Sequence, residues 1–358
     1  MFLLFFLTKN CRCHEKALSL QESNKSVTTC ASHMTQQKQD TEMISVKDFN
    51  AQVHLAHYLE QVPYDVTRQA LYSADELYAG YQPGNEATFA TCYDTRTYDH
   101  FVDTGKHSSN VLESLARALH DHGIDMALQA FFKEHDGRRC VGVMGGHATA
   151  RTDEMYRRVV LLCKELTERG FIMLSGGGPG IMEATHLGAW LAGRETGDVD
   201  EALAMLSCAP TFTDEGWLAS AFTVRKRFPQ TRFVSLGVPT WLYGHEPSTP
   251  FATHIAKFFE NSIREDNILT LAFGGIVFTP GSAGTLQEIF QDAVQNHYLT
   301  FGVASPMVFM NRRYWTEEVP VYPFLQTMME RGRYKNLLLS ITDDQEEIVS
   351  TLAQSANT

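Results

Sequence analysis

The stretch GGIVFTPGSAGTLQEIFQDAVQNHY, Gly274 to Tyr298, combines residue types that suit the binding of an anion with a group that could act on it. Small residues fill the loop PGSAGT at 280–285, and Glu288 follows shortly after it. Glycine lets a phosphate approach the backbone closely, and the free N–H groups at a helix start attract negative charge. A carboxylate in the next helical turn could act on the bound molecule as a general base. The stretch therefore predicts a phosphate site with Glu288 as the candidate catalyst.

The residues on either side of this loop predict the elements that hold it. An apolar, β-branched run at 276–279 is typical of a buried parallel strand. After the loop, apolar residues recur at helical spacing from Leu286 to Val294. We therefore expect a strand, a glycine loop and a helix in direct succession.

A second stretch has the same order of features. Residues 171–174 predict a strand, SGGGPG at 175–180 a loop, and 181–191 a helix. Two strand–loop–helix units in one chain favour a paired-loop nucleotide site, with Gly145-Gly146 after an earlier strand as a third contact. The expected substrate-binding residues are Gly145, Gly146, Ser175, Gly176, Gly177, Gly178, Gly180, Glu183, Pro280, Gly281, Ser282, Ala283, Gly284 and Thr285.

The segments GGGPGIMEA and PGSAGTLQE resemble the paired signatures of the LOG family. This family includes cytokinin riboside 5′-monophosphate phosphoribohydrolases and bacterial nucleotide 5′-monophosphate nucleosidases. Its second motif is PGGxGTxxE; Ser282 replaces the second glycine here, and the other motif positions match. The likeness extends over residues 139–310, and the region 232–264, with its GHEP loop, is closer to the longer bacterial nucleosidases.

The resemblance implies an N-glycosidase that splits a nucleoside 5′-monophosphate into free base and ribose 5-phosphate. It implies that Glu288 is catalytic, and Arg264 is the nearest match to the family's catalytic arginine, at a slightly different spacing. It also implies a small-molecule nucleotide partner, no cofactor, and a homo-oligomer that is a dimer or larger.

Structural explanations compete with these roles. Thr285 to Glu288 fits the S/T-x-x-E capping box, so Glu288 could simply cap a helix. Arg264 could be a surface arginine paired with Glu260 or Asp266.

Three further charged positions have alternatives of the same kind. Arg225 and Arg227 belong to a basic cluster that could supply other phosphate ligands or be a solvated loop. Glu183 could face the cleft or complement the dipole of its helix. We expect Asp292, on the face of Glu288, to be an exposed acid.

Composition excludes several other classes of protein. The formal net charge of −12 over 358 residues argues against binding of nucleic acid. Seven cysteines without a CxxC pair indicate reduced thiols, and the histidines form no ligand-like group, so no metal is expected. No run is long enough to span a membrane, and the first apolar residues make a poor secretory signal. These features predict a cytoplasmic protein without a membrane partner.

The chain divides into three predicted parts. Residues 1–42 read as a disordered tail, 43–136 as a mainly helical N-terminal region, and 137–358 as a Rossmann-like nucleotide-binding catalytic domain. In the N-terminal region we expect helical structure over 44–81 and a helix from Val111 that ends at His122-Gly123.

Strands and helices alternate in the third part. Strands are expected at 140–144, 171–174, 233–236, 276–279, 307–310 and 337–341. Asp153 is expected near the start of the first helix, 193–200 as a polar loop, and 255–272 as mainly helical. Such alternation predicts an α/β fold with a Rossmann-like, doubly wound parallel sheet and a ligand outside the carboxyl ends of its strands.

Two functions remain open from the residues. The first is the nucleosidase, and the alternative is a non-catalytic nucleotide-binding or sensor protein of the same fold. Amino-acid decarboxylation, an older label of the family, needs a Schiff-base lysine, and neither glycine motif contains one.

Overall fold

A computed structural model describes residues 56–244 and 246–356 of the chain. These residues belong to one compact unit, Leu55–Thr358. The predicted tail at 1–42 and the start of the predicted N-terminal region lie outside the described residues. The division at 136/137 stays a prediction.

The described chain contains a seven-stranded, fully parallel sheet in the order β4-β3-β2-β1-β5-β6-β7. The chain proceeds outward from β1 to β4, returns to place β5 beside β1, and then proceeds outward in the other direction. This is the doubly wound arrangement, and it confirms the predicted α/β, Rossmann-like fold class. The strands are β1 Cys140–Met144, β2 Ile172–Ser175, β3 Ser235–Gly237, β4 His254–Ile255, β5 Gly275–Phe278, β6 Pro306–Phe309 and β7 Leu338–Ile341.

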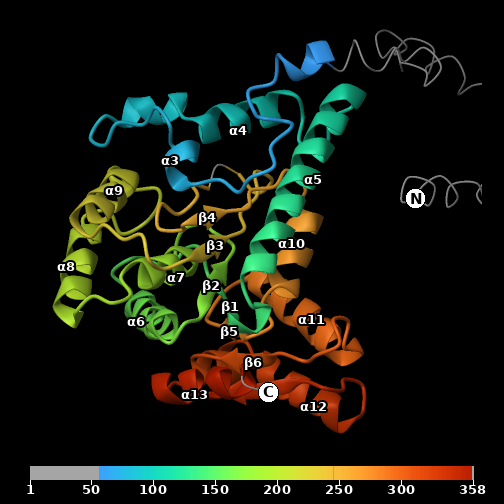
Figure 1. Ribbon diagram of the computed structural model, residues 1–358. Helices are drawn as coiled ribbons and strands as arrows, with labels where there is room; N and C mark the ends of the chain where they lie inside the picture. Colours follow the sequence, from blue (N-terminus) through green and yellow to red (C-terminus); the bar gives the residue numbers. More distant parts are fainter. Residues whose placement is uncertain (1–55, 245, 357–358) are drawn as a thin grey trace, which may run out of the picture. The chain divides into compact units, whose positions relative to one another are not determined.

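Helices cover both faces of the sheet, and the alternation of side chains along each strand explains how. In β1, Val141 and Val143 enter one apolar core, whereas Cys140 and Met144 enter the other. The first core is shared with α6 Glu154–Glu168, α7 Ile181–Trp190 and α13 Gln345–Ser355. The second is shared with α5 Val111–Glu134, α10 Asn261–Thr270, α11 Ala283–Tyr298 and α12 Val321–Glu330 (Figure 1).

Five of the six expected strands lie within about a residue of their predicted positions, but the region 255–272 differs. Its beginning belongs to β4, which pairs with β3 and also forms an antiparallel bridge from Ile255 to Tyr72. The helix α10 begins only at Asn261. A buried strand of two residues is too short to show a hydrophobic period, so its apolar residues resembled the first turn of a helix.

The helix expected to end at His122-Gly123 continues to Glu134 as α5. Gly123 lies inside this helix, where a side chain would overlap the carbonyl oxygen of Arg68. The glycine therefore permits a close approach of two backbone segments and does not end the helix.

Two other expectations about helices were wrong. The loop expected at 193–200 contains the start of α8 at Thr196, and helical structure over 44–81 is confined, among its described residues, to 56–59 and Ala74–Leu77. Asp153 caps α6 by accepting a hydrogen bond from the N–H of Met155, as expected. The remaining helices are α3 Ala74–Leu77, η2 Glu86–Thr91, α4 Tyr93–Asp103, η3 Gly137–Arg139, α8 Thr196–Leu206, α9 Trp217–Arg227 and the π-helical turn η4 Tyr314–Glu318.

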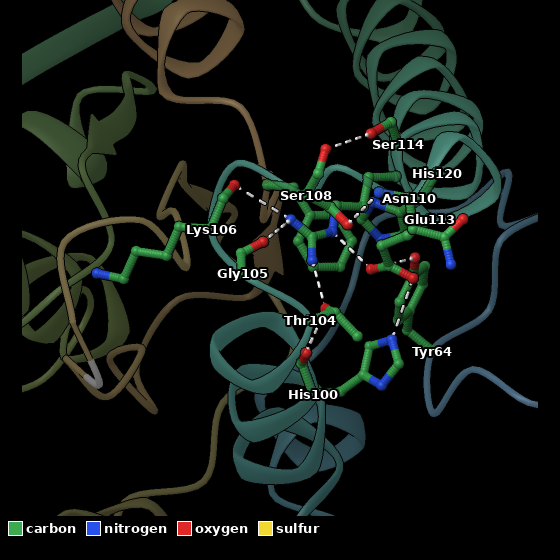
Figure 2. A network of polar contacts seen from close by, with 12 residues as sticks. Tyr64, His100, Thr104, Gly105, Lys106, Ser108, Asn110, Glu113, Ser114 and His120 are labelled. Carbon is green, nitrogen blue, oxygen red and sulfur yellow. Dashed lines mark hydrogen bonds and ion pairs between the residues drawn. The ribbon is translucent and has the colours of Figure 1, made fainter. Parts of the chain in front are cut away.

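The N-terminal helices are joined by a buried polar network around Glu113 (Figure 2). Arg117 donates to Glu113 at 2.6 Å, and Tyr58 and His100 contact the same carboxylate at 2.7 and 3.1 Å. Burial alone would raise the pKa of Glu113, but the hydrogen bonds from His100, Tyr58 and Arg117 lower it to about 2. The network therefore stays charged and fixes α4 against α5.

A second set of buried polar contacts connects these helices to the segment between β3 and α10. Lys257 is paired with Asp94 at 2.7 Å, and both side chains are almost fully buried. Asp121 of α5 accepts hydrogen bonds from the backbone N–H groups of Phe259 and Glu260. Tyr78 donates to the carbonyl oxygen of Ser248. The segment that follows β3 is thus held by the N-terminal helices.

Candidate functional site

A pocket of about 390 Å³ opens at the carboxyl ends of β1 and β5. Gly145 and Gly146 leave β1 at this point, and the loop 280–285 leaves β5. These two strands are neighbours although the chain visits three other strands between them. The pocket therefore occupies the switch point of the sheet, where ligands of doubly wound folds bind.

The loop after β5 presents a helix start to this pocket. The helix α11 begins at Ala283, and Ser282 in the N-cap position makes no side-chain capping bond. The first N–H groups of a helix have no partner within it, so those of Ala283, Gly284 and Thr285 are available to a ligand. All four residues from Ser282 to Thr285 line the pocket.

Neighbouring segments hold this loop in place. Gly146 donates its N–H to the carbonyl oxygen of Pro280 at 3.0 Å, and Tyr314 donates its hydroxyl to that of Gly281 at 2.5 Å. A side chain at Gly281 would overlap Thr285, whereas one at Gly284 would meet no atom within 4 Å. Gly281 is therefore required by the fold of the loop, and Gly284 leaves space open in the pocket.

Glu288 lines the same pocket from α11 and is only 8% exposed. Burial raises its pKa to about 7; nearby Arg264 opposes the shift and Glu265 adds to it. The capping-box interpretation is wrong, because the helix begins before Thr285 and Ser282 is its N-cap. Among the residues that the structure describes, none forms a hydrogen bond or ion pair with the Glu288 carboxyl.

Arg264 lies on α10 and faces the pocket. It donates to the carbonyl oxygen of Val238 at 2.8 Å and to Glu265 at 2.6 Å, so the alternative of a surface pairing with Glu260 or Asp266 is wrong. A side chain at Gly176 would overlap the Arg264 guanidinium. The absence of a side chain at Gly176 therefore leaves the space that the Arg264 guanidinium occupies.

None of the residues in this loop, 175–180, lines the pocket that contains Glu288. Ser175 is fully buried and shares a hydrogen bond of 2.8 Å with His186. Gly177 and Gly180 have φ angles of 72° and 68°, which suit glycine. A side chain at Gly180 would overlap the carbonyl oxygens of Gly146 and His147, and one at Gly178 would crowd Met182.

Glu183 faces a different hollow. Its carboxylate pairs with Arg151 at 2.5 Å and accepts from the Tyr156 hydroxyl at 2.8 Å. The basic cluster on α9 is also elsewhere, since Arg225 pairs with Asp75 and Arg227 with Glu201. Neither arginine lines the pocket that contains Glu288.

The sequence did not predict several residues of the pocket, and it misjudged the burial of Asp292. His147, Met182, Tyr243, Glu246, Glu265 and Gln287 also line the pocket, and apart from Glu246 in the GHEP loop no local pattern singled them out. Asp292 is 1% exposed rather than exposed, and its Oδ2 has no hydrogen-bond partner in the described part of the chain. Burial raises the pKa of Asp292 well above its usual range.

The residues described by the structure contain no group of three or more His, Cys, Asp or Glu side chains arranged to hold a metal ion. Within the same residues, no helix combines the length and apolarity that crossing a membrane requires.

Residues 138–196 match the SLOG cluster4 family. The match covers β1, α6, the glycine loop after β2 and α7, and it supports a relation to the SLOG and LOG-like superfamily rather than to the LOG family in particular. No curated protein matches the chain.

Several solved structures are similar at low identity. The molybdenum cofactor carrier protein of Chlamydomonas reinhardtii is 16% identical with a TM-score of 0.38, over 61% of this chain and 98% of that chain. The molybdenum cofactor binding protein of Rippkaea orientalis is 14% identical with a TM-score of 0.38, over 61% and 97%. The structural genomics target TM1055 is 18% identical with a TM-score of 0.39, over 60% and 98%. Similarity at this level does not indicate what the present chain binds.

Proposed function

We propose that this protein is a nucleoside 5′-monophosphate nucleosidase, which hydrolyses the N-glycosidic bond to give a free base and ribose 5-phosphate. The observation that carries the proposal is Glu288, a buried carboxyl with a pKa of about 7, in a pocket that is also lined by the start of the same helix, α11. A group that titrates near neutral pH is suited to accept and return a proton. The family match and the LOG-like motifs support a nucleotide as the substrate.

The phosphate would bind where α11 begins. The N–H groups of Ala283, Gly284 and Thr285 and the Ser282 hydroxyl offer hydrogen bonds to a dianion, and the helix dipole adds to the attraction. This contact would hold the ribose beside Glu288 in the adjoining turn.

Glu288 would then act as a general base. Cleavage of the C1′–N bond moves its electron pair to the base nitrogen and leaves positive charge on the sugar. The Glu288 carboxylate stabilises that charge and takes a proton from water, whose oxygen bonds to C1′. The proton then passes to the departing base, so that water is the only co-reactant. Arg264, which lines the same pocket from α10, would contact the substrate as well.

A nucleotide sensor or carrier is the second candidate. It is favoured by Ser282, which replaces a glycine of the family motif in the loop that lines the pocket. Such a protein would bind nucleotides without releasing a base. We also propose that the protein assembles into a dimer or larger oligomer and that it is cytoplasmic.

A nucleotide panel separates the two functions. The full chain is incubated with AMP, GMP, CMP, UMP, IMP and a cytokinin riboside monophosphate, and free base and ribose 5-phosphate are measured. We expect equimolar release of both products from at least one nucleotide. Tight binding without release would favour the sensor, and an absence of binding would contradict both functions.

A further inference from the structure

Two more hollows follow in a row from the pocket that contains Glu288. The first, of about 210 Å³, shares His147 with that pocket and is also lined by Phe212 and Trp217. The second, of about 300 Å³, shares Phe212 and Trp217 with the first and reaches Phe89 of η2. We call the first of these the Phe212 hollow. Because His147 belongs to both linings, the Phe212 hollow and the pocket lie next to each other at this residue.

His147, the residue that lines both the pocket and the Phe212 hollow, lies beside the Phe212 ring. The ring centroids of His147 and Phe212 are 6.3 Å apart, with planes inclined by 63°. His147 is exposed and Phe212 is half-buried, so both rings are accessible to a ligand. Flat heterocycles stack on such rings regardless of which base they are.

The charges around the Phe212 hollow are already paired. Arg151 and Glu183 line it, but they form a buried ion pair with each other. The Arg151 guanidinium also donates to the carbonyl oxygens of Ala209 and Trp217 and to the Ser220 hydroxyl. A phosphate would find no unpaired cation in this hollow, whereas the neutral rings remain available to a ligand.

The adjacent helix start does not change this conclusion. The first N–H group of α7, that of Ile181, donates to the carbonyl oxygen of Gly146 at 3.1 Å. The carboxylate of Glu183 in the first turn compensates the positive end of the helix. The start of α7 therefore differs from that of α11, where no acid lies in the first turn.

We infer that the Phe212 hollow is the subsite for the base of the nucleotide, where the ring stacks on Phe212 with His147 at its edge while the phosphate is held at the start of α11. The inference rests on the proposed function for the identity of the ligand. It adds the residues that receive the leaving group, and it makes Phe212 a determinant of affinity for the base and not for the sugar phosphate. The volume of the hollow far exceeds the roughly 10–15 Å³ needed by one water.

The test compares two ligands that share the phosphate and differ in the base. Binding of AMP and of ribose 5-phosphate is measured by calorimetry on the full chain carrying Glu288→Gln, which prevents turnover. Phe212→Ala in this background should weaken AMP binding at least about tenfold, as expected when one stacked base is lost. Ribose 5-phosphate should bind as before.

Matched variants keep the result interpretable. Phe212→Trp retains a stacking ring and should restore most of the AMP affinity. Phe212→Leu retains apolar bulk without a ring, and it serves as the test if Phe212→Ala does not fold. Phe301→Ala, which removes a phenylalanine that is 43% exposed outside these three hollows, should change neither affinity.

Each other outcome has a distinct meaning. Equal AMP affinity with and without the Phe212 ring would overturn the base subsite and leave the proposed function standing. Equal weakening of AMP and ribose 5-phosphate would overturn it as well, because Phe212 would then support the phosphate pocket. Failure of both ligands to bind before Phe212 is changed would overturn the phosphate site itself and the inference with it.

Discussion

Glu288 carries the proposed chemistry because its environment holds its pKa near neutral pH. The carboxylate is the active form of a general base, so kcat should rise as the pH increases through about 7 and then level off. Glu288→Gln keeps the size of the side chain and removes the base. We expect kcat to fall by at least about a hundredfold while nucleotide affinity survives. Initial rates between pH 5.5 and 9 and a binding titration measure both effects.

The melting temperature distinguishes this role from a structural one. The folded pKa of Glu288 lies above its usual value, so the folded state holds the proton more tightly than the unfolded state, and stability is lost as the pH rises from about 4.5 through 7. Glu288→Gln should therefore be at least as stable as the natural protein at pH 8. The control is Glu346→Gln on the exposed face of α13. An unchanged rate with a lower melting temperature would favour a structural role.

Arg264 should matter through the shape of its guanidinium as well as its charge. It reaches the carbonyl oxygen of Val238 and the carboxylate of Glu265 at once, a geometry that a lysine cannot reproduce. Arg264→Ala should lower kcat/KM by at least about tenfold, and Arg264→Lys should recover only part of the loss. Arg227→Ala on α9, where the arginine pairs with Glu201, is the control. Normal kinetics in both Arg264 variants would remove this residue from the mechanism.

Local sequence predicted some residues of the pocket and not others. Ser282 to Thr285 and Glu288 follow one another along a strand–loop–helix unit, so a motif captures them. Glu265, Met182 and Tyr243 reach the same space from α10, α7 and the segment after β3, and only tertiary packing brings them together. Burial of Asp292 was missed because helical spacing places it beside Glu288 without telling which other elements cover that face.

The start of α11 is the element on which the phosphate assignment depends. A phosphate there makes charge-assisted hydrogen bonds that a nucleoside cannot make, and it also anchors the sugar beside Glu288. We expect kcat/KM for AMP to exceed that for adenosine at least about a hundredfold, equivalent to roughly 2.7 kcal/mol. Parallel assays of the two substrates give the ratio directly.

Gly284 offers a way to disturb this site without disturbing the fold. A side chain at this position meets no other atom, so Gly284→Val should fold and fill the space where the phosphate binds, which should abolish the preference for AMP. Gly197 is a matched control, because it is likewise the second residue of its helix, α8, and is likewise open around its Cα. A preference that survives Gly284→Val would contradict the phosphate site.

Among the helices and strands, the sequence predicted those that have a hydrophobic period or a recognisable motif. Runs of apolar, β-branched residues indicated five of the strands to within about a residue, and Asp153 indicated the start of α6. The strand β4 was missed because it has two residues and its pairing with β3 and Tyr72 is set by distant parts of the chain. The end of α5 was misplaced because Gly123 lies inside the helix, where it makes room for the backbone of Arg68. No local sequence pattern indicates such a contact.

At the scale of the whole described unit, the N-terminal helices and the sheet share one core. Residues from α4 and α5 and from β1, β5 and β6 belong to the same apolar cluster. The buried pair of Lys257 and Asp94 fixes α4 to the segment between β3 and α10, which also carries Tyr243 and Glu246 into the pocket. The position of the pocket wall therefore depends on helices that are remote from it in sequence.

A substitution of Lys257 tests whether the N-terminal helices stabilise the segment between β3 and α10. The Lys257 ammonium lies 2.7 Å from Asp94 Oδ1, and it also donates to the Ser248 hydroxyl, with both charged side chains nearly inaccessible to water. Lys257→Met keeps the length of the side chain but leaves the Asp94 carboxylate buried without its cation, which typically costs about 3–5 kcal/mol. A loss of that size should lower the melting temperature by on the order of 10 °C. Lys226→Met on the exposed end of α9 should leave it unchanged.

A second substitution separates the charge from the packing. Asp94→Asn removes the stranded negative charge and still lets the side-chain oxygen accept from the Trp241 indole, which bonds Asp94 at 2.8 Å. The double variant Lys257→Met with Asp94→Asn should therefore be more stable than Lys257→Met alone, because an uncompensated charge is more costly than a neutral buried pair.

Calorimetry should also show one transition for residues 56–356, since the two sets of helices bury their apolar side chains in a common core. Two separate transitions, or a Lys257→Met variant that melts with the natural protein, would mean that the N-terminal helices and the sheet are stabilised independently.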